Sequence, residues 1–473
     1  MAHNEQIFTP YWVVDLILDK IGYIGKNIRK KHIIDNSCGD GAFLCRIVNR
    51  YVDYCCSIGV SYEEIAEEIA TYIHGIEIDE DLLYKCIEKL RLYEHDKIRE
   101  MLKHQHLHSR VHLVLGDALQ IDDFDNKMDF VVGNPPYCKV HDLKEKYDIV
   151  KQYSFTQEGM TDLYLAFFEK GLKMLKSNGV LAYITPNSWM TSKAGREFRN
   201  YLYNTKSLDY ILQFGSEKVF SNATTFTNIT IIDKNKTNNK FYWQYGKDGG
   251  VVESNIEKSF INGNLYLGKD EQLDKLKEIL EYSSDKCKID VKNGFATLKD
   301  KLFFVLVANV ENTTKNYRPM IKASTGKLRM GFFPYDENGN PCKFEDLDEF
   351  TQRCLLERAY ELDIDLSKTD WYLYGRSQGL RDFKKEKITI NNIIKDVDSI
   401  KISKAEKYWG VYSGLYIVSN DNDELNEDYI QKILNQEDFI DGYVKLLGKY
   451  KNGGYYTFSS DDLKKYLNYY YKK

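Results

Sequence analysis

One short stretch limits the possible folds of this chain more than any other: Asp129-Phe-Val-Val-Gly-Asn-Pro-Pro-Tyr137. The apolar residues before Asn134 are typical of the end of a buried strand, and two prolines then end it because proline cannot donate to a sheet ladder. We therefore expect Asn134 at the carboxyl end of a strand, which is where open α/β sheets bind their ligands.

The side chains of this stretch suit the binding of a planar amino group. The amide oxygen of Asn134 and the carbonyl oxygen of Pro135 can accept both hydrogens of an NH2 group, while the Tyr137 ring can stack on the flat molecule that carries it. Such a nitrogen is a poor nucleophile because its lone pair is delocalised, and accepting both hydrogens helps to localise that lone pair. Taken alone, the stretch is also compatible with an ordinary strand-to-loop turn.

Three strand-and-turn units come before this stretch. The first, residues 32–44, contains the spacing DxxxGxG, whose glycines let the backbone pass close to a ligand. The second ends at Glu77, which could accept hydrogen bonds from both hydroxyls of a ribose, and the third ends at Asp117, which could accept from an adenine amino group. The spacing differs from the GxGxxG fingerprint and no GxxxxGK[ST] motif follows, which disfavours NAD and ATP.

Strand and helix patterns alternate as far as residue 232, which predicts a doubly wound α/β sheet of mostly parallel strands. The polar residues 233–240 are the predicted linker, so we expect one domain over residues 1–240 and another over residues 241–473. The second part is rich in aromatic residues and lacks the βα repeat, which indicates an α+β domain. With 473 residues and 43% hydrophobic content, the chain can bury large cores.

Composition narrows the class of protein further. The formal net charge of −5 gives no global indication of nucleic-acid binding, although a local basic face would suffice. Residues 1–10 lack the pattern of a signal peptide, and the nine cysteines include no CxxC pair, so we expect a reduced, soluble, cytoplasmic protein. The alternating histidines of residues 104–108 lack acidic or cysteine neighbours, and we expect no metal site there.

Taken in order, the Thr9-Pro10 helix start, the DxxxGxG turn, Glu77, Gly116-Asp117 and Asn134-Pro-Pro-Tyr137 resemble the gamma class of DNA adenine-N6 methyltransferases, the TaqI type. The resemblance covers roughly residues 7–232. Two segments of the second domain, Asn293-Gly-Phe-Ala-Thr-Leu-Lys-Asp-Lys301 and Gly375-Arg-Ser-Gln378, look like parts of the target recognition domains of related restriction–modification methyltransferases.

This resemblance implies that S-adenosylmethionine is the cofactor, that no metal is needed and that the target is an adenine flipped out of double-stranded DNA. The residues implied to carry the reaction are Asn134, Pro135, Pro136 and Tyr137. Tyr137 would stack on the target base, together with Phe220 or, as the competing choice, Phe226. The cofactor-binding residues implied are Thr9, Asp35, Ser37, Gly39, Gly41, Glu77, Asp117, Ala118 and Asn134.

In the second domain, Arg and Gln side chains suit guanine and adenine edges, and Lys and Arg suit phosphates. The DNA-binding residues expected there are Lys299, Arg376, Ser377, Gln378 and Arg381. We expect a monomer that acts on DNA and leaves cleavage to a separate restriction endonuclease, or an orphan relative without one, because no PD…ExK pattern is evident.

Two other classes remain as alternatives. An RNA or protein (glutamine) amino-methyltransferase could use the same Asn-Pro-Pro-Tyr element, but a small amide does not require a second domain of this length. A DNA-binding protein that has lost the reaction is disfavoured because each motif position expected to carry chemistry is intact. The DNA sequence recognised cannot be read from these residues.

Overall fold

The computed structural model describes residues 8–92, 110–139, 142–143, 147–217, 219–220, 226–283, 288–304, 314–420 and 425–471. The histidines of residues 104–108 lie outside these ranges. The chain divides into two compact units, Met1–Leu273 and Asp274–Lys473, and each is described by itself.

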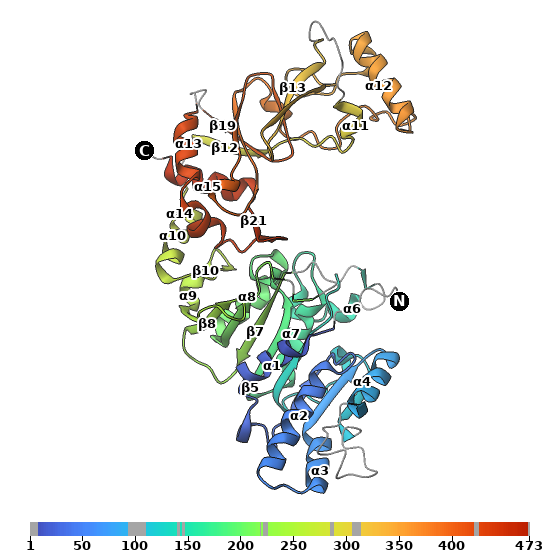
Figure 1. Ribbon diagram of the computed structural model, residues 1–473, viewed down its shortest axis with the longest axis vertical. Helices are drawn as coiled ribbons and strands as arrows, with labels where there is room; N and C mark the ends of the chain where they lie inside the picture. Colours follow the sequence, from blue (N-terminus) through green and yellow to red (C-terminus); the bar gives the residue numbers. More distant parts are fainter. Residues whose placement is uncertain are drawn as a thin grey trace. The chain divides into compact units, whose positions relative to one another are not determined.

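Unit 1 is built on a twisted sheet of nine strands in the order β3-β2-β1-β4-β5-β7-β6-β8-β9 (Figure 1). The strands from β3 to β5 in this order pair in parallel, whereas β7 runs antiparallel between β5 and β6. The mostly parallel α/β fold expected from the sequence is therefore confirmed. The strands are β1 (Ile33–Asp35), β2 (Ile73–Glu77), β3 (His112–Leu115), β4 (Met128–Gly133), β5 (Leu175–Pro186), β6 (Leu208–Gln213), β7 (Thr227–Asp233), β8 (Lys240–Tyr245) and β9 (Val252–Asn255).

Helices cover both faces of this sheet. Successive residues of a strand point to opposite faces, so the apolar residues of one strand pack into two separate clusters. Ile33 of β1 and Val132 of β4 lie in one hydrophobic cluster, while Ile34 and Val131 lie in the other. The first cluster also contains side chains of α1 (Tyr11–Lys20), α2 (Ala42–Ser57), α3 (Tyr62–Tyr72) and α4 (Glu80–Leu92). The second contains side chains of α6 (Tyr147–Val150), α7 (Leu163–Met174), α8 (Arg196–Thr205) and α9 (Ile256–Ser259).

The register of the parallel strands brings their carboxyl ends to one edge of the sheet. Asp35, the last residue of β1, pairs with Gly75 of β2 and with Val132 of β4. The polar residues that follow these strands are therefore neighbours in space although they are far apart in the sequence. This edge carries the candidate site.

The division between the units comes later in the chain than the predicted linker. Residues 233–240 include the end of β7, a turn over residues 234–239 and the start of β8, and β8 pairs in parallel with β6 inside the same sheet. The division of the chain falls after Leu273, within the residues of α10 (Asp270–Glu281). A polar turn between two strands has the same composition as a linker, which is why the sequence pattern placed the boundary too early.

Unit 2 combines small sheets with short helices around a core rich in aromatic side chains. Phe295 stacks on Tyr374 with ring centroids 4.6 Å apart, and the Tyr374 hydroxyl donates to the carbonyl of Phe332 at 2.6 Å. Its sheets have the orders β12-β19-β15-β17, β14-β13-β18 and β16-β21-β20. The strands are β12 (Ile289–Asn293), β13 (Tyr317–Lys322), β14 (Lys327–Phe332), β15 (Lys387–Ile390), β16 (Ile393–Ile394), β17 (Ile402–Ala405), β18 (Gly410–Tyr412), β19 (Leu415–Ser419), β20 (Tyr450–Lys451) and β21 (Tyr455–Thr457). The helices are α11 (Asp300–Phe303), α12 (Glu349–Glu361), α13 (Glu427–Leu434), α14 (Glu437–Phe439) and α15 (Ser460–Tyr470).

Candidate functional site

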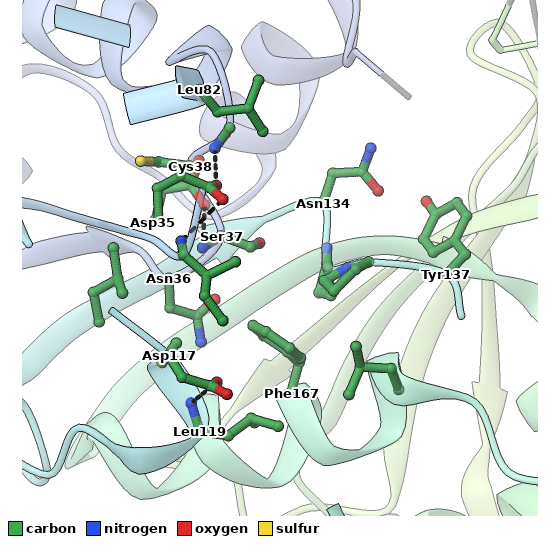
Figure 2. A pocket seen from close by; sticks show the side chains of 18 of the residues that line it. Asp35, Asn36, Ser37, Cys38, Leu82, Asp117, Leu119, Asn134, Tyr137 and Phe167 are labelled. Carbon is green, nitrogen blue, oxygen red and sulfur yellow. Dashed lines mark hydrogen bonds between the residues drawn. The ribbon is translucent and has the colours of Figure 1, made fainter. Parts of the chain in front are cut away.

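A cavity of about 390 Å³ opens at the carboxyl edge of the unit 1 sheet, within the size range of small-molecule sites. The turn after β1 lies on one side of it, and Asn134 and Tyr137 lie on the other, with Phe167 of α7 between them (Figure 2). The cavity brings together most of the cofactor and reaction residues expected from the sequence. Those among its lining residues are Thr9, Asp35, Ser37, Gly39, Glu77, Asp117, Ala118, Asn134, Pro135, Pro136 and Tyr137.

The turn between β1 and α2 is held by backbone bonds and requires glycine at two positions. Gly39 and Gly41 have φ values of +52° and +86°, in the left-handed region that other residues avoid. A Cβ atom on Gly41 would lie 2.7 Å from the Sγ atom of Cys86, so a side chain there would also push α4 away. Because Gly41 directly precedes α2, the turn presents backbone amides at the start of a helix.

Glu77 joins this turn to the end of β2. Its Oε2 atom accepts a hydrogen bond from the backbone amide of Gly39 at 2.8 Å, and its Oε1 atom accepts from the amides of Ile78 and Asp79 at 2.9 and 3.0 Å. These bonds fix the carboxylate at the cavity wall. Each carboxylate oxygen has more than one lone pair, so the group can still accept hydrogen bonds from ligand hydroxyls.

Asp35 is a buried carboxyl group at the bottom of the same turn. Burial raises its pKa to about 8, against the bond that its Oδ1 atom accepts from the Ser37 amide at 3.1 Å. The nearby carboxylates of Glu77 and Asp40 raise it further. Burial thus favours the protonated form of this carboxyl group, whereas a cationic ligand group beside it would favour the ionised form.

Asp117 and an apolar surface form another wall of the cavity. The Oδ1 atom of Asp117 accepts from the backbone amide of Leu119 at 3.1 Å, which orients the carboxylate at the end of β3 (Figure 2). Leu82, Leu119 and Phe167 line the cavity nearby. A planar ring could lie against these apolar side chains while Asp117 accepts a hydrogen bond from its edge.

Asn134 follows the last residue of β4 and is anchored from the amino-terminal side of the chain. Its Nδ2 atom donates to the Oγ1 atom of Thr9 at 3.1 Å. Thr9 is buried just before α1, whose side chains Val13 and Ile17 pack into the core. At the preceding position, Gly133 has a φ of +152° and a Cβ atom there would lie 2.7 Å from Oδ1 of Asp35. The strand end and the first turn thus pack directly against each other.

Tyr137 lies at the cavity with its hydroxyl group engaged. The hydroxyl donates to the backbone carbonyl of Ile184 at 3.1 Å, and the ring makes an edge-to-face contact with Tyr164. Burial holds the pKa of Tyr137 well above its usual value, so the phenol stays neutral at any physiological pH. Tyr137 can therefore offer a ring face to a ligand, but it cannot act as a base.

The second aromatic residue expected beside the target is not among the residues that line this cavity. Phe220 is 4% exposed and packs in the hydrophobic cluster on the α1–α4 side of the sheet. The competing residue, Phe226, accepts a bond from the Asn187 amide at its backbone carbonyl. The role of either ring in contacting a base stays a prediction.

Several cavity residues were not expected from the sequence. The sequence could have indicated two of them, because Phe8 directly precedes Thr9 and Asn36 lies inside the DxxxGxG turn. No such indication exists for Phe167, because α7 reads as an ordinary amphipathic helix. The unexpected lining residues include Phe8, Asn36, Leu82, Leu119, Ile149 and Phe167.

The residues expected to contact DNA lie in unit 2. Arg376, Ser377, Gln378 and Arg381 are exposed. Lys299 is half-buried, and its Nζ atom donates to the carbonyl of Trp371 at 2.9 Å, a bond that competes with any contact to a phosphate.

Two further features of the described residues bear on the expected class. Over these ranges, no group of three or more His, Cys, Asp or Glu side chains is arranged to hold a metal ion. Among the same residues, no helix has the length and apolar character needed to cross a membrane.

Comparison with known proteins finds a family model that matches part of unit 1. Residues 57–220 match the family model "Eco57I restriction-modification methylase". These residues are thus similar to a restriction–modification methylase domain. This confirms the resemblance inferred from the motifs, and the match includes Glu77, Asp117 and Asn134.

Individual relatives agree with this family. The chain is 24% identical over 394 residues to the Type II restriction enzyme and methyltransferase RM.Eco57I of Escherichia coli, covering 70% of this chain and 39% of that protein. It is 26% identical over 245 residues to the Type II methyltransferase M.BstVI of Geobacillus stearothermophilus, covering 50% of this chain and 42% of the relative. The chain thus spans about two fifths of the length of these curated relatives.

Among solved structures, the fold is similar to that of the Type IIL restriction-modification enzyme MmeI, determined in complex with DNA. The TM-score is 0.64 at 14% sequence identity, and the similarity covers 95% of this chain and 64% of that one. Because the similarity extends over nearly all of this chain, both units have counterparts in the fold of that enzyme.

Proposed function

We propose that this protein is a DNA methyltransferase that transfers the methyl group of S-adenosylmethionine to N6 of an adenine flipped out of double-stranded DNA. The observation that carries the proposal is one cavity lined on one side by the Asp35–Gly39 turn and Glu77 and on the other by Asn134 and Tyr137. A nucleoside-containing ligand and a planar amino group would meet there. The restriction–modification methylase family supports DNA as the substrate.

The residues present fit this cofactor. The Gly39–Gly41 turn and the carboxyl group of Asp35 would hold its amino-acid part, Glu77 would accept from the ribose hydroxyls, and Asp117 would accept from the adenine amino group. Leu119 and Phe167 would pack on the purine. When bound, the cofactor supplies an electrophilic methyl group attached to a sulfonium.

The proposed binding of the target adenine depends on Asn134 and its neighbours. Flipping an adenine out of the duplex costs about a few kcal/mol, which contacts in the pocket must offset. The Asn134 amide oxygen and the Pro135 carbonyl would accept the two N6 hydrogens and so localise the nitrogen lone pair. Tyr137, held at its hydroxyl by Ile184, would stack on the base.

None of the residues proposed to contact the target amino group can act as a base near neutral pH. Asn134, Pro135 and Pro136 do not ionise near neutral pH, and the raised pKa of Tyr137 keeps its phenol protonated. The contribution of these residues is therefore positioning and hydrogen-bond polarisation. The proposed enzyme works as a monomer on DNA.

The substitution Asn134→Ala tests the proposal. It removes the acceptor for the target amino group, and we expect methyl transfer to plasmid DNA to fall by at least about a thousandfold, a loss comparable with that of a key transition-state hydrogen bond. Binding of the cofactor, measured by isothermal titration calorimetry, should persist.

The same assay separates the alternative substrates. Labelled cofactor is offered to plasmid DNA, to total RNA and to protein, and the methylated nucleosides are identified by mass spectrometry. Label in N6-methyladenine of DNA supports the proposal. Label in RNA or in glutamine instead would assign the protein to another class of amino-methyltransferase, and transfer by Asn134→Ala at the wild-type rate would refute the site.

A further inference from the structure

Two loops of unit 2, residues 294–299 and 375–381, are joined edge to edge and are called here the paired loops. Ala296 and Arg376 exchange backbone hydrogen bonds of 3.0 and 2.9 Å, and the amide of Gly375 donates to the carbonyl of Thr297 at 3.1 Å. The loops are therefore held through their main chains.

Leu298 lies at the outer end of the paired loops in a conformation that leucine disfavours. Its φ is +56°, in the left-handed region, and its side chain is 70% exposed. A left-handed backbone is costly for a residue with a Cβ atom, and an exposed isobutyl group gains little from burial. Neither local preference nor packing accounts for leucine at this position. Backbone strain of this kind is kept where the surroundings enforce it and is frequent at functional sites.

The surroundings of Leu298 hold it firmly. A Cβ atom at position 375 would lie 2.4 Å from Cδ1 of Leu298, so the leucine side chain rests directly on the glycine backbone. On its other side, Thr297 accepts from the Lys299 amide at 3.3 Å and donates to Asp300, while Lys299 is bound to the Trp371 carbonyl. The apolar tip is thus exposed, while the residues on either side of it are held by hydrogen bonds.

The side chains next to Leu298 suit nucleic acid. Arg376, Ser377 and Gln378 are exposed on the adjacent loop, and Arg381 follows them. Among the residues that the structure describes, Arg376 and Arg381 form no ion pair. Guanidinium groups contact phosphates and guanine edges, glutamine contacts adenine edges, and an apolar group contacts the thymine methyl.

We propose that Leu298 is a base-contacting residue whose isobutyl group enters a groove of double-stranded DNA between contacts made by Arg376 and Gln378. This inference rests on the proposed function, since it assigns a specificity-determining residue to the same DNA substrate. Gly375 is its positioning partner, because only a glycine leaves room for the leucine side chain.

The test compares DNA binding by Leu298→Ala, Leu298→Gly and Leu328→Ala. Leu328 of β14 is another exposed leucine of unit 2, at 50%, and serves as the matched control. The duplex that wild-type protein methylates is first identified by mapping modified adenines in DNA from an expressing host. Affinities are then measured for that duplex and for a scrambled duplex of the same composition.

Both Leu298 variants should bind the recognised duplex about tenfold more weakly, which is on the order of one lost base contact. Binding of the scrambled duplex and the dependence of affinity on salt should be unchanged, because leucine neutralises no phosphate. Leu298→Gly should melt no lower than wild type, since glycine accepts the left-handed backbone, and this excludes unfolding as the cause. Leu328→Ala should bind as wild type does.

Equal affinity of wild type and both Leu298 variants for the recognised duplex would overturn the inference, and so would an equal loss on both duplexes. A change in oligomeric state without a change in DNA affinity would assign Leu298 to a protein contact instead. If wild type methylates no DNA, the proposed function itself fails, which is a separate outcome seen before any Leu298 variant is made.

Discussion

The contact between Thr9 and Asn134 couples the beginning of α1 to the proposed reaction centre. A hydroxyl group can donate or accept, so Thr9 can form a hydrogen bond with either the oxygen or the NH2 group of the Asn134 side chain. When a target amino group needs the amide oxygen, the amide NH2 must turn towards Thr9, which then accepts its hydrogen at the observed 3.1 Å. Thr9 would thus hold the side chain in the plane that the reaction needs.

We therefore predict that Thr9→Val slows methyl transfer by about tenfold or more, since losing a buried hydrogen-bond partner costs about 1–3 kcal/mol. Thr9→Ser, which keeps the hydroxyl, should stay near the wild-type rate. Single-turnover rates at saturating cofactor measure the effect, alongside the cofactor dissociation constant. If Thr9→Val instead weakens cofactor binding and recovers its full rate at saturation, then Thr9 serves the cofactor and does not position Asn134.

At the scale of elements, three histidines connect neighbouring strands at the amino edge of the sheet, opposite the cavity. The Nδ1 atom of His32 lies 3.1 Å from Nε2 of His74, and Nδ1 of His74 lies 3.1 Å from Nδ1 of His112. His74 is 6% exposed, and both of its ring nitrogens are used. Burial, followed by the two neighbouring imidazoles, lowers the pKa of His74 to about 3. The pKa of His32 is lowered too, by burial and then by Lys176, although Asp129 opposes this.

This arrangement predicts a stability that falls as the solution is acidified. In the unfolded chain His74 takes up a proton near pH 6.5, but in the folded chain it does so only near pH 3. Between these values the unfolded state binds more protons, so the stabilising contribution present above about pH 6.5 is lost with decreasing pH, by at most about 1.4 kcal/mol per pH unit.

Urea unfolding at several pH values between 5 and 7 measures this slope. His74→Gln, whose amide can donate and accept but does not ionise in this range, should flatten it. An identical pH dependence in the variant and the wild type would show that other groups cause the loss.

The elements around the cavity could be predicted because their signals are local. Asp35, Glu77 and Asn134 each come at the end of an apolar strand, and glycines after Asp35 and prolines after Asn134 mark two of these strand ends in the sequence. Strand direction carries no such signal, because an antiparallel strand such as β7 has the same periodicity as a parallel one. The position of Phe167 in the cavity wall could not be predicted either, because it depends on how α7 packs against strands that are far away in the chain.

At the scale of the whole molecule, the cavity residues that the structure describes belong to unit 1, whereas the paired loops belong to unit 2. Cofactor binding should therefore stabilise one unit selectively. At a hundredfold excess over its dissociation constant, a ligand that binds only the folded state contributes about 2.7 kcal/mol, or roughly 5–10 °C for a unit of this size.

Differential scanning calorimetry of the intact chain tests this expectation. We expect two transitions, of which only one moves when S-adenosylmethionine is added, and Asn134→Ala should show the same shift. A single transition that moves as a whole would mean that the two units unfold together.

The backbone pairing between residues 296–297 and 375–376 has an evolutionary consequence. Hydrogen bonds between main chains are indifferent to side-chain identity, so mutations at the outward positions of these loops can accumulate with little penalty to folding. Gly375 and the left-handed position beside it are the exceptions, since they set the shape of the loops. A lineage could in this way drift from one recognised DNA sequence to another while the fold that carries the loops is inherited intact.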